Sequence, residues 1–259
     1  MLIDSHCHMD AAEFDADRPE VIARAQAAGV TAQVIPAIAR NAFEKLRDLC
    51  ASAPGLHPAY GLHPMFLAAH RPQHLDVLRE WIEQEHPVAI GECGLDFFIE
   101  GFDRHSQHMY FQRQLELARE FELPLIVHAR SAVEETIGMI RRVGGLRGVI
   151  HSYSGSAEQA AQLWKMGFSL GIGGPVTHDR ARRLRALVAQ MPLEFLLLET
   201  DSPDQPPNGH RGERNEPAYL REVLGAVAEL RGADGHSIEK ATSENACRLF
   251  RLPAPTPLS

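Results

Sequence analysis

Three things are scarce or missing in this chain: lysine, paired cysteine and long apolar runs. No apolar run approaches the roughly 18–20 residues of a membrane-spanning helix, so we expect no such helix. The four cysteines form no C-x-x-C pair and suggest no disulfide framework. Because the first residues also lack the pattern of a signal peptide, we expect a cytoplasmic protein. Lysine occurs only at Lys45, Lys165 and Lys240, each within a predicted helix.

Positive charge is also in short supply. The chain has 26 Lys and Arg against 34 Asp and Glu, which gives a net charge of −8. This balance argues against strong electrostatic binding of duplex nucleic acid, because such binding needs clustered cations. It leaves open a phosphate substrate that metal ions and a few arginines hold.

Apolar, β-branched runs alternate with stretches of helical periodicity along the whole chain. Eight strand–helix units can be counted, with helices such as 73–85 and 104–121, and a further helix at about 237–250. Runs such as LPLIV and FLLLE are apolar on both faces, as buried parallel strands are. The count predicts an α/β fold, a (β/α)8 TIM barrel, as a single domain over residues 1–252 with a tail at 253–259. A doubly wound sheet is the alternative, but its Gly-rich turn is missing after the first strand.

Histidines and acids follow most of the predicted strands. In such a barrel the active site lies at the carboxyl ends of the strands. Each residue alone has a plain structural explanation, such as a hydrogen-bonded histidine or an acid that caps a helix. Their joint occurrence at one end favours ligands of one or two divalent metals. The candidate ligands are His6, His8, Glu92, His128, His151 and Asp201.

Two of these acids are also the catalytic candidates. Glu92 has two oxygens and can bridge two ions about 3.5–4 Å apart. A carbamylated lysine cannot take that role, because no lysine stands at a strand end. Asp201 can orient the attacking water and take its proton.

Three further residues are candidates for substrate binding. His63 and Arg130 lie near strand ends and can bind a phosphate, although Arg130 can equally form a salt bridge on the following helix. Tyr153 can stack on a base or hydrogen-bond a phosphate, and a packed aromatic is the equal alternative. The loop after the last strand carries Arg211 and Arg214, which can contact a nucleic-acid strand or simply belong to an ordinary connection.

The chain resembles the TatD family of metal-dependent deoxyribonucleases, within the amidohydrolase-type barrels. The matching stretches, in the family's order, are DSHCHMD, YGLHP, GECGLDFF, LPLIVHAR, HSYSG and LETDSP. The resemblance implies that one metal is held by His6, His8, Glu92 and Asp201. It implies that a second is held by Glu92, His128 and His151. The two divalent ions are expected to be zinc, manganese or magnesium.

The resemblance also implies a substrate and a reaction. It suggests hydrolysis of phosphodiester bonds in DNA, as a 3′-5′ exodeoxyribonuclease on single strands or ends. We expect no membrane and no obligate protein partner. A two-metal hydrolase of a small phosphoester, lactone or cyclic amide is the alternative, and a barrel that only binds is a third.

Overall fold

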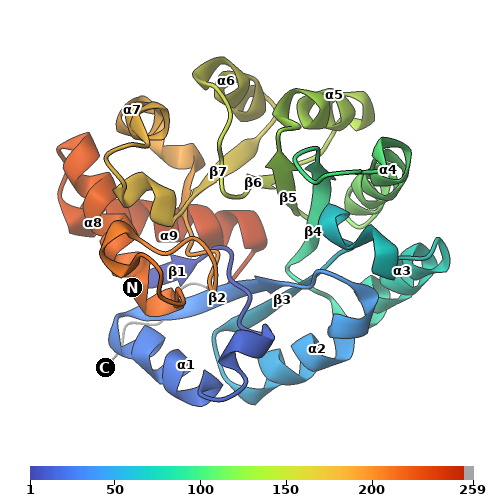
Figure 1. Ribbon diagram of the computed structural model, residues 1–259, viewed down its shortest axis with the longest axis horizontal. Coiled ribbons are helices and arrows are strands. Elements are labelled where there is room, and N and C mark those ends of the chain that lie inside the picture. The colour runs from blue at the N-terminus through green and yellow to red at the C-terminus, as the bar shows by residue number, and fades with distance from the viewer. Residues whose placement is uncertain (254–259) are drawn as a thin grey trace. The chain divides into compact units, whose positions relative to one another are not determined.

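A computed structural model describes residues 1–253 of the chain. Its eight strands form one sheet in which strand order follows sequence order. Figure 1 follows the chain from β1 in blue to α9 in red, with strands and helices in alternation. The strands are β1 (Leu2–Asp4), β2 (Val30–Pro36), β3 (Leu56–Tyr60), β4 (Ala89–Asp96), β5 (Leu125–Arg130), β6 (Gly148–Ile150), β7 (Phe168–Ile172) and β8 (Leu196–Leu198).

Helices connect the strands, so the strand pairs β1–β2, β3–β4, β4–β5, β5–β6 and β6–β7 are all parallel. The helices are α1 (Arg18–Ala27), α2 (Phe43–Ser52), α3 (Gln73–Glu85), α4 (Arg104–Glu120), α5 (Val133–Val143), α6 (Ala157–Lys165), α7 (Arg182–Gln190), α8 (Leu220–Arg231) and α9 (Gly235–Phe250). The predicted (β/α)8 fold class is confirmed. The predicted tail lies outside the described residues from position 254 onward.

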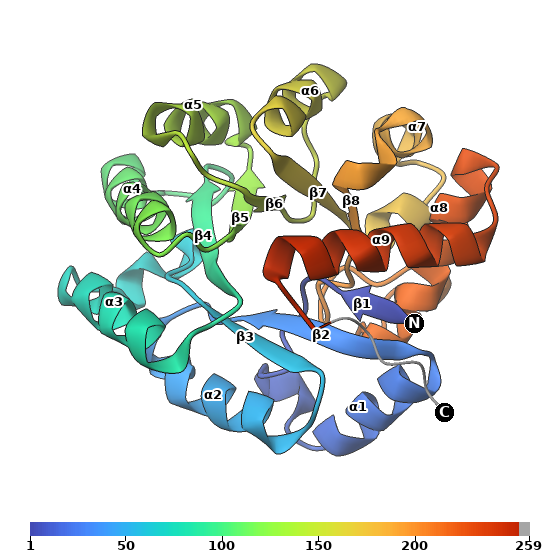
Figure 2. The same ribbon diagram turned by 180° about the vertical axis from the view of Figure 1, so that it is seen from behind.

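The chain divides into two compact units. The first comprises Met1–Ile35, Pro54–Leu56 and the chain from Gly171 onward, and the second comprises Pro36–Ala53 and His57–Leu170. Within the first unit, α9 packs against β1 and β8, and Figure 2 shows α9 beside β1. The single-domain organisation stays a prediction.

Apolar side chains fill both units. In the second unit, all eight residues of β4 are buried, including the acids Glu92 and Asp96. The rings of Phe43 and Tyr60 meet there with centroids 5.1 Å apart. In the first unit, Phe14, Leu197 and Val227 are almost fully buried. Burial of this kind stabilises by about 1.5–3 kcal/mol for each large apolar side chain.

Within residues 1–253, no helix combines the length and the apolar character that crossing a membrane requires.

Candidate metal centres

Three candidate ligands come together in the first unit. The Nε2 atoms of His6 and His8 are 3.2 Å apart, and they lie 3.4 and 3.8 Å from Oδ1 of Asp201. His6 and His8 follow β1, and Asp201 follows β8, where its amide donates to the carbonyl of His6 at 2.9 Å. The backbone of Asp201 has a φ of 56°, a left-handed conformation that the surrounding structure must hold in place. The three ligand atoms therefore point toward one small volume.

Asp4 ties the two strand ends of this set together. Its carboxylate is fully buried and accepts hydrogen bonds from the Thr200 amide at 3.0 Å, the Thr200 hydroxyl at 2.6 Å and the His6 amide at 3.3 Å. Burial raises the pKa of Asp4 to about 7, against the lowering effect of these bonds. Asp4 thus fixes the end of β1, and with it His6, relative to the segment that carries Asp201.

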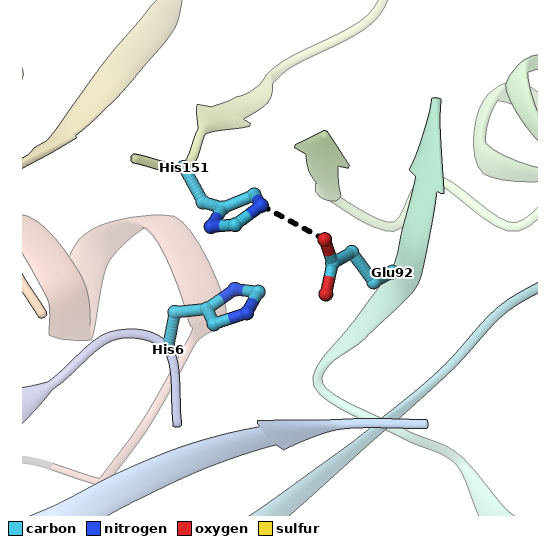
Figure 3. Close-up of side chains that lie close together, drawn as sticks. All are labelled: His6, Glu92 and His151. Carbon is cyan, nitrogen blue, oxygen red and sulfur yellow. Dashed lines mark ion pairs between the residues drawn. The ribbon is translucent and has the colours of Figure 1, made fainter. Parts of the chain in front are cut away.

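Three other candidate ligands come together in the second unit. Glu92 is almost fully buried in β4, and its Oε1 lies 2.8 Å from Nε2 of His151, the pair joined by a dashed line in Figure 3. The same oxygen lies 3.2 Å from Nδ1 of His128. The two histidine nitrogens are themselves 3.2 Å apart. His128 lies in β5 and His151 directly follows β6, so three neighbouring parallel strands supply this triad.

Asp96 determines which nitrogen His128 presents to the triad. Its Oδ2 lies 2.8 Å from Nε2 of His128 and accepts a hydrogen bond from that nitrogen. The lone pair of a neutral His128 is therefore on Nδ1, the atom that faces Glu92 and His151. Burial opposes a charge on His128, but hydrogen bonds to Asp96 and Glu92 outweigh it and raise the pKa of His128. A carboxylate behind a histidine in this way is the usual support of a metal ligand.

His63 has the opposite arrangement. Its Nδ1 accepts a hydrogen bond from the Met65 amide at 3.1 Å, so the proton of the neutral ring is on Nε2. That Nε2 donates to Oε1 of Glu92 at 2.8 Å. Burial lowers the pKa of His63, which favours this neutral form. His63 is placed to hold Glu92 and has no lone pair directed at the triad.

Both sets fit a divalent cation by their donor chemistry. Ligands at 2.0–2.1 Å from a tetrahedral zinc ion lie about 3.3 Å from one another. The mutual distances of 2.8 to 3.2 Å in the Glu92 triad are close to this value. The distances of 3.2 to 3.8 Å in the His6 set bracket it. Imidazole and carboxylate donors suit zinc, manganese and iron alike, and magnesium prefers oxygen.

The other predicted contacts lie in different surroundings. Arg130 ends β5 and is exposed, and its guanidinium lies 3.9 Å from the ring centroid of Phe98. Tyr153 is 3% exposed, and its hydroxyl donates to the carbonyl of Ser156 at 2.6 Å. The stacking role predicted for Tyr153 is not open to a ring buried in this way, so the packed-aromatic alternative is favoured.

The two arginines of the loop after β8 also lie in different surroundings. Arg211 is exposed and lines a cleft of about 330 Å³ together with Arg180 and Gln205. The side-chain amide of Gln205 donates to Oδ2 of Asp201, so this cleft adjoins the first ligand set. Arg214 instead makes two hydrogen bonds of 2.7 Å to the carboxylate of Asp17. Arg214 is therefore a structural residue of the loop.

We expect Asp17→Asn to destabilise the protein at neutral pH, because it removes this ion pair. The hydrogen bond from Arg214 lowers the pKa of Asp17 from 3.8 to about 2. Since the folded-state pKa is depressed, the contribution is present above the unfolded pKa and is lost as the pH falls through the folded pKa. Urea unfolding should show a difference from wild type that shrinks between about pH 4 and pH 2. Asp179→Asn is the control, because Asp179 is 96% exposed and its ion pair with Arg185 is long, at 3.8 Å, so its difference from wild type should be much smaller.

Asp4 and Asp96 are the site residues that sequence reasoning missed. A signal was present for Asp96, because it is four residues after Glu92 in one strand and even spacing puts both on one side. Asp4 likewise precedes His6 by two residues. The sequence pattern alone does not distinguish an acid that supports a metal ligand from an acid that caps a helix.

Comparisons with known proteins identify the family of the chain. The family model described as TatD related DNase matches residues 3–251. An uncharacterised metal-dependent hydrolase of Bacillus subtilis, YabD, is 36% identical, covering 97% of this chain and all of its own length. A Pantoea protein named 3′-5′ ssDNA/RNA exonuclease TatD is 35% identical, covering 97% of this chain and all of its own length. The crystal structure of the Escherichia coli TatD homologue YjjV superposes with a TM-score of 0.94 at 35% identity, covering 97% of this chain and 98% of that one. The chain therefore belongs to the TatD-related DNase family and is a metal-dependent hydrolase.

Proposed function

We propose that this hydrolase cleaves phosphodiester bonds of DNA, as a 3′-5′ exonuclease on single strands or strand ends. The observation that carries the proposal is the triad of Glu92, His128 and His151, in which Asp96 fixes the tautomer of one ligand. The name of the Pantoea relative, a 3′-5′ ssDNA/RNA exonuclease, supports the choice of substrate and polarity.

In this proposal the two sets hold divalent cations, one with His6, His8 and Asp201 and one with Glu92, His128 and His151. The sharing of Glu92 between the two cations stays a prediction. Zinc, manganese and magnesium are the candidates, and the donor set favours the first two. Such ions, when bound, provide the Lewis acidity that activates water and neutralises charge on the phosphoryl oxygens.

The chain's own residues then have distinct tasks. Asp201 Oδ1 faces His6 and His8, and Oδ2 is held by Gln205, so the carboxylate is oriented to align a water and accept its proton. Glu92 is oriented by the histidines around Oε1, and the Nε2 of His63 donates a hydrogen bond to this oxygen. We assign a role in phosphate binding to Arg130, whose guanidinium is exposed to solvent.

The test is a digestion of 5′-labelled single-stranded DNA, with products separated by length. Protein loaded in turn with Zn²⁺, Mn²⁺ and Mg²⁺ is expected to give a ladder that shortens from the 3′ end. Removing the metal with a chelator is expected to abolish the ladder, and adding metal back should restore it.

An unchanged ladder in the chelated protein would contradict a metal-dependent reaction. No cleavage with any of the three ions would end the nuclease proposal for this substrate. A panel of small phosphoesters, lactones and cyclic amides would then test the alternative hydrolase.

A further inference from the structure

Large apolar side chains are exposed at only three positions among residues 1–253. Met65, Phe66 and Phe98 have exposed fractions of 45, 39 and 64%. Met65 and Phe66 belong to a 3-10 helix, Pro64–Ala69, that follows β3, and Phe98 lies two residues after β4. Scattered apolar side chains on a surface are ordinary, so the place of these three relative to the candidate ligands decides their meaning. All three lie in the second unit, on loops that follow the carboxyl ends of strands.

Each phenylalanine is linked by one residue to the Glu92 triad. The Phe66 ring lies 5.6 Å from that of His63, which donates to Glu92. The Phe98 amide donates at 2.9 Å to Oδ1 of Asp96, whose other oxygen holds His128. The Phe66 ring and the backbone of Phe98 are therefore each one residue away from a member of the triad, and neither belongs to a remote part of the unit.

A cation completes this surface. The β4–β5 register pairs Asp96 with Arg130, which puts the Arg130 guanidinium 3.9 Å from the centroid of the Phe98 ring. The Arg130 side chain is exposed at the end of β5, so an incoming anion can reach its guanidinium. An aromatic face beside an arginine is the arrangement that binds single-stranded nucleic acid, because bases stack on the ring and the cation contacts a phosphate.

We infer that Phe66, Phe98 and Arg130, the stacking surface, bind the bases and backbone of a single-stranded nucleic acid next to the scissile phosphate. The inference deepens the proposed function and rests on it. A paired base has its faces covered by its neighbours in a duplex, so a stacking surface selects unpaired nucleotides. This choice agrees with the net charge of −8, which disfavours binding a long duplex.

The test compares Phe98→Leu with wild type in the binding of two fluorescent oligonucleotides of equal length. One is oligo-dT, and the other is an abasic strand with the same phosphates and no bases. Binding is followed by fluorescence anisotropy in EDTA, so that no turnover occurs. Leucine keeps the apolar bulk but removes the π face, so affinity for oligo-dT is expected to fall about tenfold. Affinity for the abasic strand is expected to stay unchanged.

The chain offers a matched control in Phe121→Leu. Phe121 follows α4, and the guanidinium of Arg79 lies 5.4 Å from its ring centroid, so it is a similar cation–aromatic pair away from the candidate ligands. This variant should bind both strands like wild type, and Phe98→Tyr should do so as well. Arg130→Gln should lower the affinity for both oligonucleotides. It should also reduce the slope of log affinity against log salt concentration by about 0.7.

A Phe98→Leu protein that binds oligo-dT as wild type does would overturn the inference. If wild type still produces a ladder in that case, the proposed function stands and only the stacking surface fails. If wild type binds oligo-dT through Phe98 but cleaves nothing with any metal, the proposed function fails instead. A change of oligomeric state in Phe98→Leu, with DNA binding intact, would show a protein-binding face and also overturn the inference.

Discussion

Glu92→Gln is expected to lower turnover of single-stranded DNA by at least about a thousandfold, because it removes the one charge at the centre of the triad. Oε1 of Glu92 lies 2.8 Å from His63, 2.8 Å from His151 and 3.2 Å from His128. Glutamine keeps the shape of the side chain but offers a neutral and weaker oxygen ligand. The variant should also retain less metal after gel filtration, which atomic absorption would measure without any assay of activity.

Glu80→Gln is the matched control for this change. Glu80 is exposed on α3, in the same unit, and its substitution changes the net charge by the same amount. It should leave metal content and turnover at wild-type values. If Glu92→Gln behaves like Glu80→Gln in both measurements, the triad is not the metal centre.

Gly94→Ala is expected to destabilise the protein by about 3 kcal/mol or more, which is the range for forced backbone displacement in a packed interior. Gly94 is in the middle of β4, with a φ of 138° that side-chain-bearing residues rarely adopt. A Cβ there would overlap the carbonyl oxygen of His128 and come within 3.0 Å of its amide nitrogen. Since β4 pairs Gly94 with His128, the strands would have to separate at a candidate ligand.

Urea unfolding with a constant m value would measure this loss. Gly138→Ala is the contrasting change, because Gly138 lies within α5 and a Cβ there meets only the Arg142 side chain at 3.7 Å. It should stabilise the helix by about 0.5–1 kcal/mol. Equal effects of the two substitutions would contradict the close approach of β4 and β5 at Gly94.

Patterns along the chain were sufficient for the regular elements. The predicted helix at 73–85 has the same bounds as α3, and the helix predicted at 104–121 ends one residue earlier in the structure. The reason is physical: helical periodicity and both-sided apolar strands are local properties of the sequence. The gathering of ligands within each unit was also foreseeable, since parallel strands present their carboxyl ends at one edge.

What local patterns could not supply were the contacts between residues distant in sequence. The Nδ1 lone pair of His63 is taken by the Met65 amide, so this histidine differs from His128 although the sequence predicts both at strand ends. Tyr153 was an equal choice between surface and interior, and only packing decides that choice. Arg214 and Arg211 are three residues apart in one loop, yet only Arg214 meets an acid, Asp17, from another segment.

The two oxygens of Asp96 connect the Phe98 backbone to the candidate ligand His128. One holds the Phe98 amide and the other holds His128, so a displacement of the Phe98 loop is transmitted to a candidate ligand through a single rigid group. Coupling between two binding events is reciprocal: whatever a bound strand does to the cation affinity, the cation does equally to the strand affinity. Any ligand that displaces the Phe98 backbone would therefore change the position of His128 through Asp96. Asp96 would then be a coupling residue as well as a support for His128.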